Sequence, residues 1–159
     1  MRVVVATDGS EAAIDAAHRS IELLRPEAEV VLVTVIPEKE DPMDDAGGME
    51  GPTITPEQAD KHWEKVTREG IAALNRTASG IAPEVDIRLV PADQEPGPAL
   101  VRIAAELHAD VLVIGSSGKG RFRRIWNPSV SEYIVHHAHC PVLLVRHEHH
   151  GSLAEKSES

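Results

Sequence analysis

The sequence has 159 residues, with 16 Lys or Arg against 26 Asp or Glu, so its formal net charge is −10. A chain of this length suits one ordinary domain with a single core and leaves little room for two. Apolar residues make up 42% of the sequence, which suffices for that core, whereas aromatic residues make up only 3%. An acidic chain with few rings disfavours nucleic acid as a partner, because phosphate contacts need cations and base stacking needs rings.

The sequence gives no sign of membrane insertion or export. No apolar run approaches the roughly 20 residues that span a bilayer, and the first such run, Val3–Ala6, is soon followed by Asp8. The single cysteine, Cys140, can form no intrachain disulfide and excludes a cysteine-rich metal site. We therefore expect a cytoplasmic protein without a membrane partner.

Five short runs rich in Val, Ile and Leu are typical of buried strands. They are Arg2–Thr7, Val30–Ile36, Val85–Val90, Val111–Ile114 and Val142–Arg146. Between them, apolar residues recur at helical spacing, for example at Ile14, Ala17, Ile21 and Leu24. Strands that alternate with helices predict an α/β fold, with a mostly parallel sheet covered by helices on both faces.

Helix and domain boundaries can also be predicted. Thr55 begins the sequence Thr-Pro-Glu-Gln, which offers a capping Thr, a first-turn Pro and a Gln, so a helix should start near Pro56. Residues 37–55 before it are acidic and rich in Pro and Gly, which predicts a long loop. Residues 147–159 form a polar tail that we expect to fray, leaving a domain of residues 1–146.

The first candidate site is the segment Ala6–Ser10, which has the sequence Ala-Thr-Asp-Gly-Ser. It follows the first predicted strand, at the edge where open α/β sheets bind ligands. In a structural interpretation, Asp8 or Ser10 caps the next helix by accepting amide hydrogen bonds. In a functional interpretation, Asp8 accepts a hydrogen bond from a sugar hydroxyl or a base amine.

The second candidate site, Gly115–Glu132, follows the fourth predicted strand and contains three glycines that let backbone amides approach a ligand. Four cations then fall within six residues: Lys119, Arg121, Arg123 and Arg124. Ser129 begins the capping-box pattern Ser-Val-Ser-Glu, which would direct free amides and a helix dipole at an anion. This pattern predicts a phosphate site. The alternative is a flexible turn followed by solvated basic residues.

Known catalytic and metal-binding templates are absent from the sequence. Gly120 is followed by Arg121, which breaks a P-loop, and no Gly-x-Ser-x-Gly elbow is present. Six of the nine histidines lie between His136 and His150, but the adjacent pair His136 and His137 lacks the i, i+4 spacing of a chelating pair. We therefore name no catalytic residue and predict no metal site.

Taken together, these motifs resemble those of the universal stress protein family. The resemblance rests on two motifs. The first is Thr-Asp-Gly-Ser after the first strand. The second follows the fourth strand and consists of Gly-x-x-Gly, a spacer of nine residues, one position that is small in the family, and Ser. It extends through residues 31–35, 109–115, 129–133 and 139–146, and covers essentially Arg2 to Arg146.

The resemblance implies a Rossmann-like three-layer α/β/α fold with a five-stranded parallel sheet of order 3-2-1-4-5, and ATP held where strands one and four diverge. Its nucleotide contacts would be Thr7 and Asp8 at the ribose and base, Val35 and Ile114 at the adenine, and Gly115, Gly118, Ser129 and Val130 at the phosphates, with the cation Lys119 beside them. Pro128 departs from the Gly of the nucleotide-binding branch and offers no N–H. If that amide is a ligand, its loss would cost about 1.5 to 3 kcal/mol.

The resemblance further implies an ATP-binding stress-response and signalling module, with Mg²⁺ accompanying the nucleotide and at most slow ATP hydrolysis. A nucleotide-free dimeric interaction protein of the same fold is the alternative that Pro128 favours. An adenylyl-transferring enzyme ranks last, because its loop motif is missing after the first strand. Family protomers join through the last strand, and the apolar segment Pro141–Arg146 predicts a homodimer through that edge.

Overall fold

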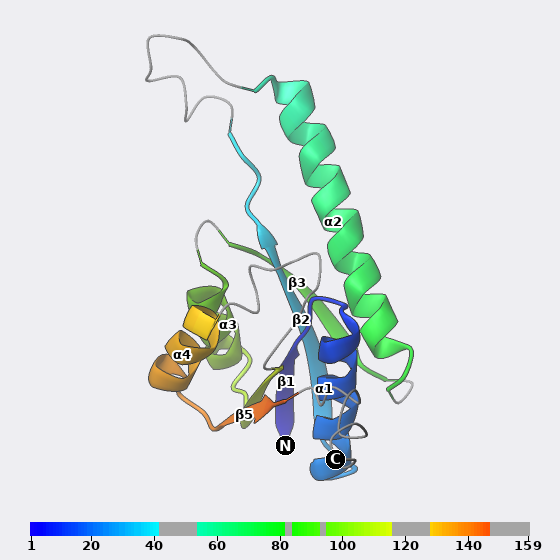
Figure 1. Cartoon of the computed structure of the whole chain (residues 1–159), viewed down its shortest axis with the longest axis vertical. Coiled ribbons are helices and arrows are strands. Elements are labelled where there is room, and N and C mark those ends of the chain that lie inside the picture. The colour runs from blue at the N-terminus through cyan, green and yellow to red at the C-terminus, as the bar shows by residue number, and fades with distance from the viewer. Residues whose placement is uncertain (42–53, 82–83, 93–94, 116–127, 147–159) are drawn as a thin grey trace, which may run out of the picture.

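In the computed structural model, five segments rich in Val, Leu and Ile form one parallel sheet (Figure 1). The structure describes residues 1–41, 54–81, 84–92, 95–115 and 128–146. The strands are β1 (Arg2–Ala6), β2 (Glu29–Pro37), β3 (Asp86–Ala92), β4 (Val111–Gly115) and β5 (Val142–Val145). Their order is β3-β2-β1-β4-β5, and every neighbouring pair is parallel. The predicted fold class and strand order are confirmed.

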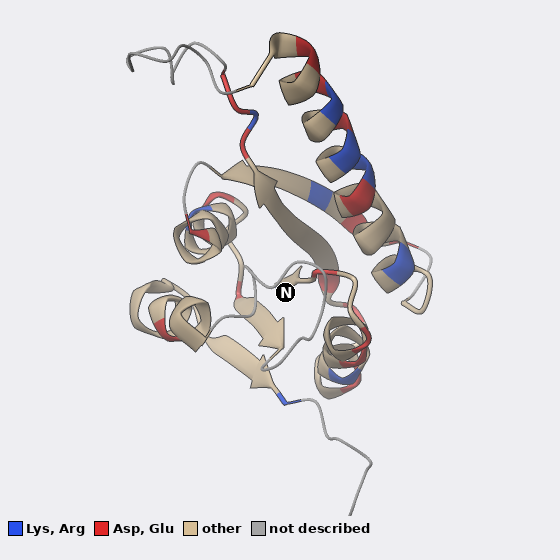
Figure 2. Cartoon of the chain, turned by 45° about the horizontal axis from the view of Figure 1, so that its top comes forward, with Lys and Arg blue, Asp and Glu red and all other residues tan. Residues whose placement is uncertain are grey.

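Helices cover both faces of the sheet and complete three layers (Figures 1 and 2). They are α1 (Glu11–Leu23), α2 (Pro56–Ala78), α3 (Pro96–Glu106) and α4 (Pro128–His137). Successive residues of β1 point to opposite faces, so Val3 and Val5 pack with α1 and α2, whereas Val4 and Ala6 pack with α3 and α4. Burial of each such valine stabilises the fold by roughly 1.5 to 3 kcal/mol.

Helix α2 begins where the sequence predicts. The Thr55 hydroxyl accepts a hydrogen bond from the Gln58 amide at 3.2 Å, and the Gln58 side-chain oxygen accepts one from the Thr55 amide at 2.9 Å. This capping box satisfies two of the amides that a helix leaves unpaired at its start. The 23-residue helix extends beyond the sheet at its N-terminal end, while its other end reaches the start of α1 (Figure 1).

The start of α4 differs from the prediction. The sequence pattern predicts Ser129 as the N-cap, but the helix begins at Pro128, so that Ser129 lies within the first turn. Proline suits the first helical position because its fixed φ is already helical and its missing amide has no intrahelical partner there. That preference outweighs the capping-box pattern one residue further on.

Within the described ranges, no helix combines the length and the apolar character needed to cross a membrane. Nor do three or more His, Cys, Asp or Glu side chains of this part of the chain gather where they could hold a metal ion. The predicted tail, residues 147–159, and the basic run at 119–124 lie outside the described residues.

Candidate functional site

The carboxyl ends of β1 and β4 lie side by side where the connections of the sheet diverge. From β1 the chain crosses to β2 on one side, whereas β4 lies on the other side of β1. Val5 pairs with Val113, so Thr7 and Gly115, each two residues further on, reach the same edge. Open α/β sheets bind ligands at such a switch point. The structure therefore brings the beginnings of both predicted site segments together.

Asp8 is the unusual residue at this edge. The residue is only 3% exposed, and one carboxylate oxygen, Oδ1, accepts a hydrogen bond from the Ser10 amide at 2.9 Å. The other oxygen, Oδ2, is buried and has no hydrogen-bond partner among the described residues. A buried acceptor without a donor is costly, and native structures contain few of them. A donor on a bound ligand would satisfy this oxygen.

The cap of α1 is made by Ser10. Its hydroxyl oxygen accepts a hydrogen bond from the Ala13 amide at 3.2 Å. Of the two residues that the structural interpretation offered as a cap, Ser10 therefore has this role. The cap of α1 therefore provides no hydrogen-bond partner for Oδ2 of Asp8.

Thr7, the other ligand contact predicted at this edge, is held by hydrogen bonds within the protein. It is fully buried, its amide donates to the Val33 carbonyl at 2.9 Å, and its carbonyl accepts from the Thr34 hydroxyl at 2.7 Å. Its hydroxyl lies 2.8 Å from the Thr77 hydroxyl and accepts from the Gly9 amide at 3.1 Å. Every polar group of Thr7 thus has a protein partner, so Thr7 shapes the loop around Asp8.

The two predicted adenine contacts, Val35 and Ile114, lie on one face of the sheet, together with Val130, which is predicted at the phosphates. Val35, Ile114 and Val130 all belong to the buried cluster between the sheet and the pair α3 and α4. These residues are 5%, 2% and 2% exposed, respectively. Each lies near the end of its strand or the start of its helix, and together they bring apolar surface close to the switch point.

The predicted phosphate contacts are described only in part. Gly115 is buried at the end of β4, and Ser129 is exposed in the first turn of α4. Gly118 and Lys119 lie outside the described residues. Pro128 is exposed at the first position of α4, where it provides no amide, so the first backbone amide of that helix belongs to Ser129.

Thr34 and Thr77 were not predicted from the sequence; both are fully buried and hydrogen-bonded to Thr7. In the sequence, the only sign of Thr77 is a polar residue at a position where the helical spacing predicts an apolar one. Thr77 follows Ala73 and Leu74 on the buried face of α2. That spacing does not identify the partner, because the contact joins positions 70 residues apart.

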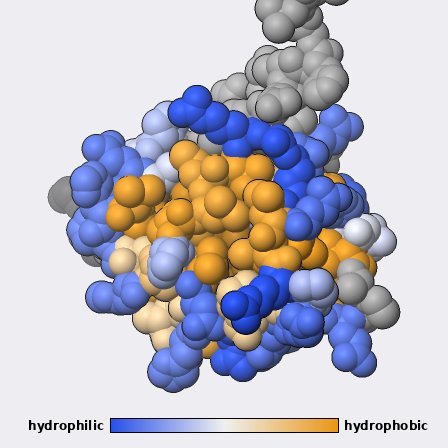
Figure 3. Space-filling view, turned by 90° about the horizontal axis from the view of Figure 1, so that it is seen from below, coloured by the Kyte–Doolittle hydropathy of each residue, from blue (hydrophilic) through white to orange (hydrophobic). Residues whose placement is uncertain are grey.

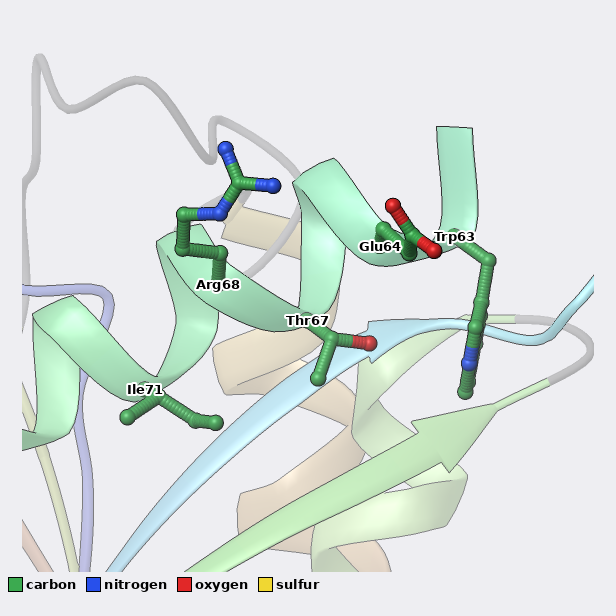
Figure 4. A pocket seen from close by; sticks show the side chains of 5 residues that line it. All are labelled: Trp63, Glu64, Thr67, Arg68 and Ile71. Carbon is green, nitrogen blue, oxygen red and sulfur yellow. The ribbon is translucent and has the colours of Figure 1, made fainter. Parts of the chain in front are cut away.

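Two other features are separate from this site. A shallow hollow runs along α2, lined by Trp63, Glu64, Thr67, Arg68 and Ile71 (Figure 4), and none of the predicted site residues lines it. Cys140 is half-buried, and its burial raises the pKa of the thiol. The thiol is therefore protonated near neutral pH and is a weak nucleophile.

A sequence model of the universal stress protein family matches residues 1–146. The chain belongs to the universal stress protein family. The matched span holds all nine residues predicted to contact the nucleotide, together with Thr34 and Thr77.

One relative and two solved structures are similar to this chain over most of their length. Universal stress protein MJ0531 of Methanocaldococcus jannaschii is 30% identical over 152 residues, which cover 91% of this chain and 81% of that relative. The structure of hypothetical protein MJ0577 superimposes with a TM-score of 0.70 at 24% identity, covering 93% of this chain and 96% of the other. The structure of the universal stress protein from Archaeoglobus fulgidus in complex with dAMP superimposes with a TM-score of 0.58 at 23% identity, covering 91% of this chain and 97% of the other. At these identities the structural likeness shows the fold.

Proposed function

We propose that this universal stress protein binds an adenine nucleotide at the carboxyl edge between β1 and β4. We favour ATP, accompanied by Mg²⁺, as the ligand, and we place the protein in the cytoplasm as a stress-response and signalling module. Its output would be a conformational or assembly state, with at most slow ATP hydrolysis. The observation that carries this proposal is the buried, unpartnered Oδ2 of Asp8 among the described residues at the switch point.

The chemistry of Asp8 limits what it can bind. A carboxylate only accepts hydrogen bonds, so it suits a ribose hydroxyl or the amine of adenine and repels phosphate. The phosphates would lie toward α4, whose N-terminus carries the positive end of the helix dipole. The dAMP complex of the Archaeoglobus fulgidus relative supports an adenine nucleotide as the ligand class.

Pro128 supports a second candidate function. A proline at the start of α4 withholds one amide from any phosphate bound there. If the remaining donors are too few, the protein does not retain nucleotide and acts as a dimeric interaction module of the same fold. The fold is the same in both cases, so only a binding measurement separates them.

A homodimer through β5 is part of the proposal, and the two edges of the sheet support it. The β3 edge carries Asp86, Arg88 and Pro91, which are typical of strands protected from pairing. The β5 edge is Val-Leu-Leu-Val, and its Leu144 is 39% exposed. Figure 3 shows a broad hydrophobic area on the end of the molecule where β5 lies in Figure 1. A two-fold axis would pair β5 antiparallel with its copy.

The test of the function is nucleotide content followed by titration. Protein purified without added nucleotide is precipitated with acid, and the released small molecules are identified by chromatography and mass spectrometry. Calorimetric titration with ATP, ADP, AMP and cAMP, with and without Mg²⁺, then ranks the ligands. We expect a bound or titratable adenine nucleotide. If none of the four binds at millimolar concentration, the interaction-module function replaces nucleotide binding.

A further inference from the structure

The last turns of α2 carry a hydroxyl that reaches the loop around Asp8. Thr77 donates its single hydroxyl hydrogen to the Ala73 carbonyl at 2.9 Å. The hydrogen bond between the Thr77 and Thr7 hydroxyls, at 2.8 Å, must then be donated by Thr7. Both threonines are fully buried, so neither hydroxyl can turn to water instead.

This arrangement makes the Thr7 hydroxyl oxygen a hydrogen-bond acceptor for the loop. With its hydrogen directed at Thr77, the Thr7 oxygen presents its lone pairs to the loop and accepts the Gly9 amide at 3.1 Å. Gly9 in turn lies directly against Ala73 of the same helix. The end of α2 therefore supports the residues on both sides of Asp8.

We propose that Thr77 is a positioning residue of the nucleotide site: it touches no ligand, but it holds the loop that aims Asp8. This inference rests on the proposed nucleotide binding. When Thr77 is replaced by Val, the buried Thr7 hydroxyl loses its acceptor, which is a costly state. We expect Thr7 to turn to another partner and release the Gly9 amide. The binding conformation of the loop is then less populated, and the apparent affinity falls in proportion to its population.

The experiment compares three variants by titration with ATP and AMP, well below their melting temperatures. Thr77→Val removes the hydroxyl and keeps the shape, and it should weaken binding by roughly three- to tenfold, the effect of one buried hydrogen bond. Thr77→Ser keeps the hydroxyl and should stay close to the parent protein.

Ser20→Ala is the matched control. Ser20 is also fully buried, and its hydroxyl donates to the Ala17 carbonyl of its own helix at 2.7 Å, but within the described residues it makes no hydrogen bond to the loop. Ser20→Ala should therefore lower stability and leave the affinity unchanged. The proposal is overturned if Thr77→Val binds like the parent, if Thr77→Ser loses as much affinity as Thr77→Val, or if Ser20→Ala loses as much.

A second measurement needs no ligand. Hydrogen exchange of the Gly9 amide in the free protein should be faster in Thr77→Val than in the parent or in Ser20→Ala, because that amide has lost its acceptor. If the parent binds no nucleotide, the proposed function fails and the positioning role fails with it. If the parent binds but Gly9 exchange is unchanged in Thr77→Val, only the positioning role is overturned.

Discussion

Gly9 lies so close to Ala73 that a Cβ built on Gly9 would be 2.7 Å from the Ala73 Cα. This contact joins the loop after β1 to the end of α2. Gly9 also has a φ of +71°, a left-handed conformation that residues with a side chain rarely adopt. Only glycine satisfies both conditions, so the path of the chain beside Asp8 depends on this residue.

Gly9→Ala should therefore destabilise the protein. We expect a loss of about 2 to 4 kcal/mol, from the left-handed backbone and from overpacking against a helix backbone that cannot move aside. Chemical denaturation measures the change. Gly97→Ala is the control: Gly97 is buried, whereas Gly9 is half-buried, and its new Cβ would meet the Tyr133 ring at 3.0 Å, without a left-handed φ. If Gly9→Ala is no less stable than Gly97→Ala, the close approach does not constrain the loop.

Asp8→Asn should weaken nucleotide binding without a matching loss of stability. The substitution keeps an oxygen for the Ser10 amide and removes the second acceptor, so nucleotide affinity should fall by roughly tenfold or more, the effect of a hydrogen bond to a charged group. Stability without ligand should change little, because the unpaired buried oxygen is replaced by an unpaired buried amide nitrogen, while a buried charge is removed. Titration and denaturation of the same preparation give both values.

Asp110→Asn is the control for that pair of effects. Asp110 accepts the Arg2 amide at 2.7 Å before the start of β4, at the opposite end of that strand from Gly115. The same chemical change there should cost stability and leave nucleotide affinity unchanged. Equal losses of affinity in the two variants would show that Asp8 has no specific role.

Pro128→Ala should tighten nucleotide binding if the first amide of α4 contacts phosphate. The substitution restores that N–H, which is worth up to about tenfold in affinity, or ~1.4 kcal/mol. Pro128→Gly restores the same donor, but it also loosens the unfolded chain and should lower stability by roughly 0.4 to 1 kcal/mol. These effects oppose each other in a thermal shift assay, so titration is the measurement to use. Unchanged ATP affinity in both variants would mean that the missing amide is not a ligand.

The fold could be predicted from the sequence because its signals are local. The strands are Val-rich runs bounded by polar residues, and the start of α2 follows from four consecutive residues that form the capping box. The start of α4 was predicted wrongly because two local preferences competed at Pro128 and Ser129.

The site was predicted less completely than the fold. Asp8 could be identified, since it follows a strand at the binding edge of the sheet. The hydrogen bonds of Thr7 could not be predicted, because its hydroxyl is held by Thr77 from a helix 70 residues away, and a buried threonine on a helix has no sequence feature that names its partner. Which polar groups remain available to a ligand is thus decided by tertiary contacts.

The two edges of the sheet offer a matched test of the proposed dimer. Leu144 on β5 and Ile87 on β3 are 39% and 38% exposed, so a lysine at either position meets a similar environment within one protomer. Leu144→Lys should place two like charges in the β5 interface and shift the protein toward monomer, since like charges across paired strands are destabilising. Ile87→Lys should leave the dimer intact. Sedimentation velocity over a range of micromolar concentrations measures both. A parent protein that is monomeric throughout, or an Ile87→Lys variant that dissociates as readily as Leu144→Lys, would exclude β5 as the dimer edge.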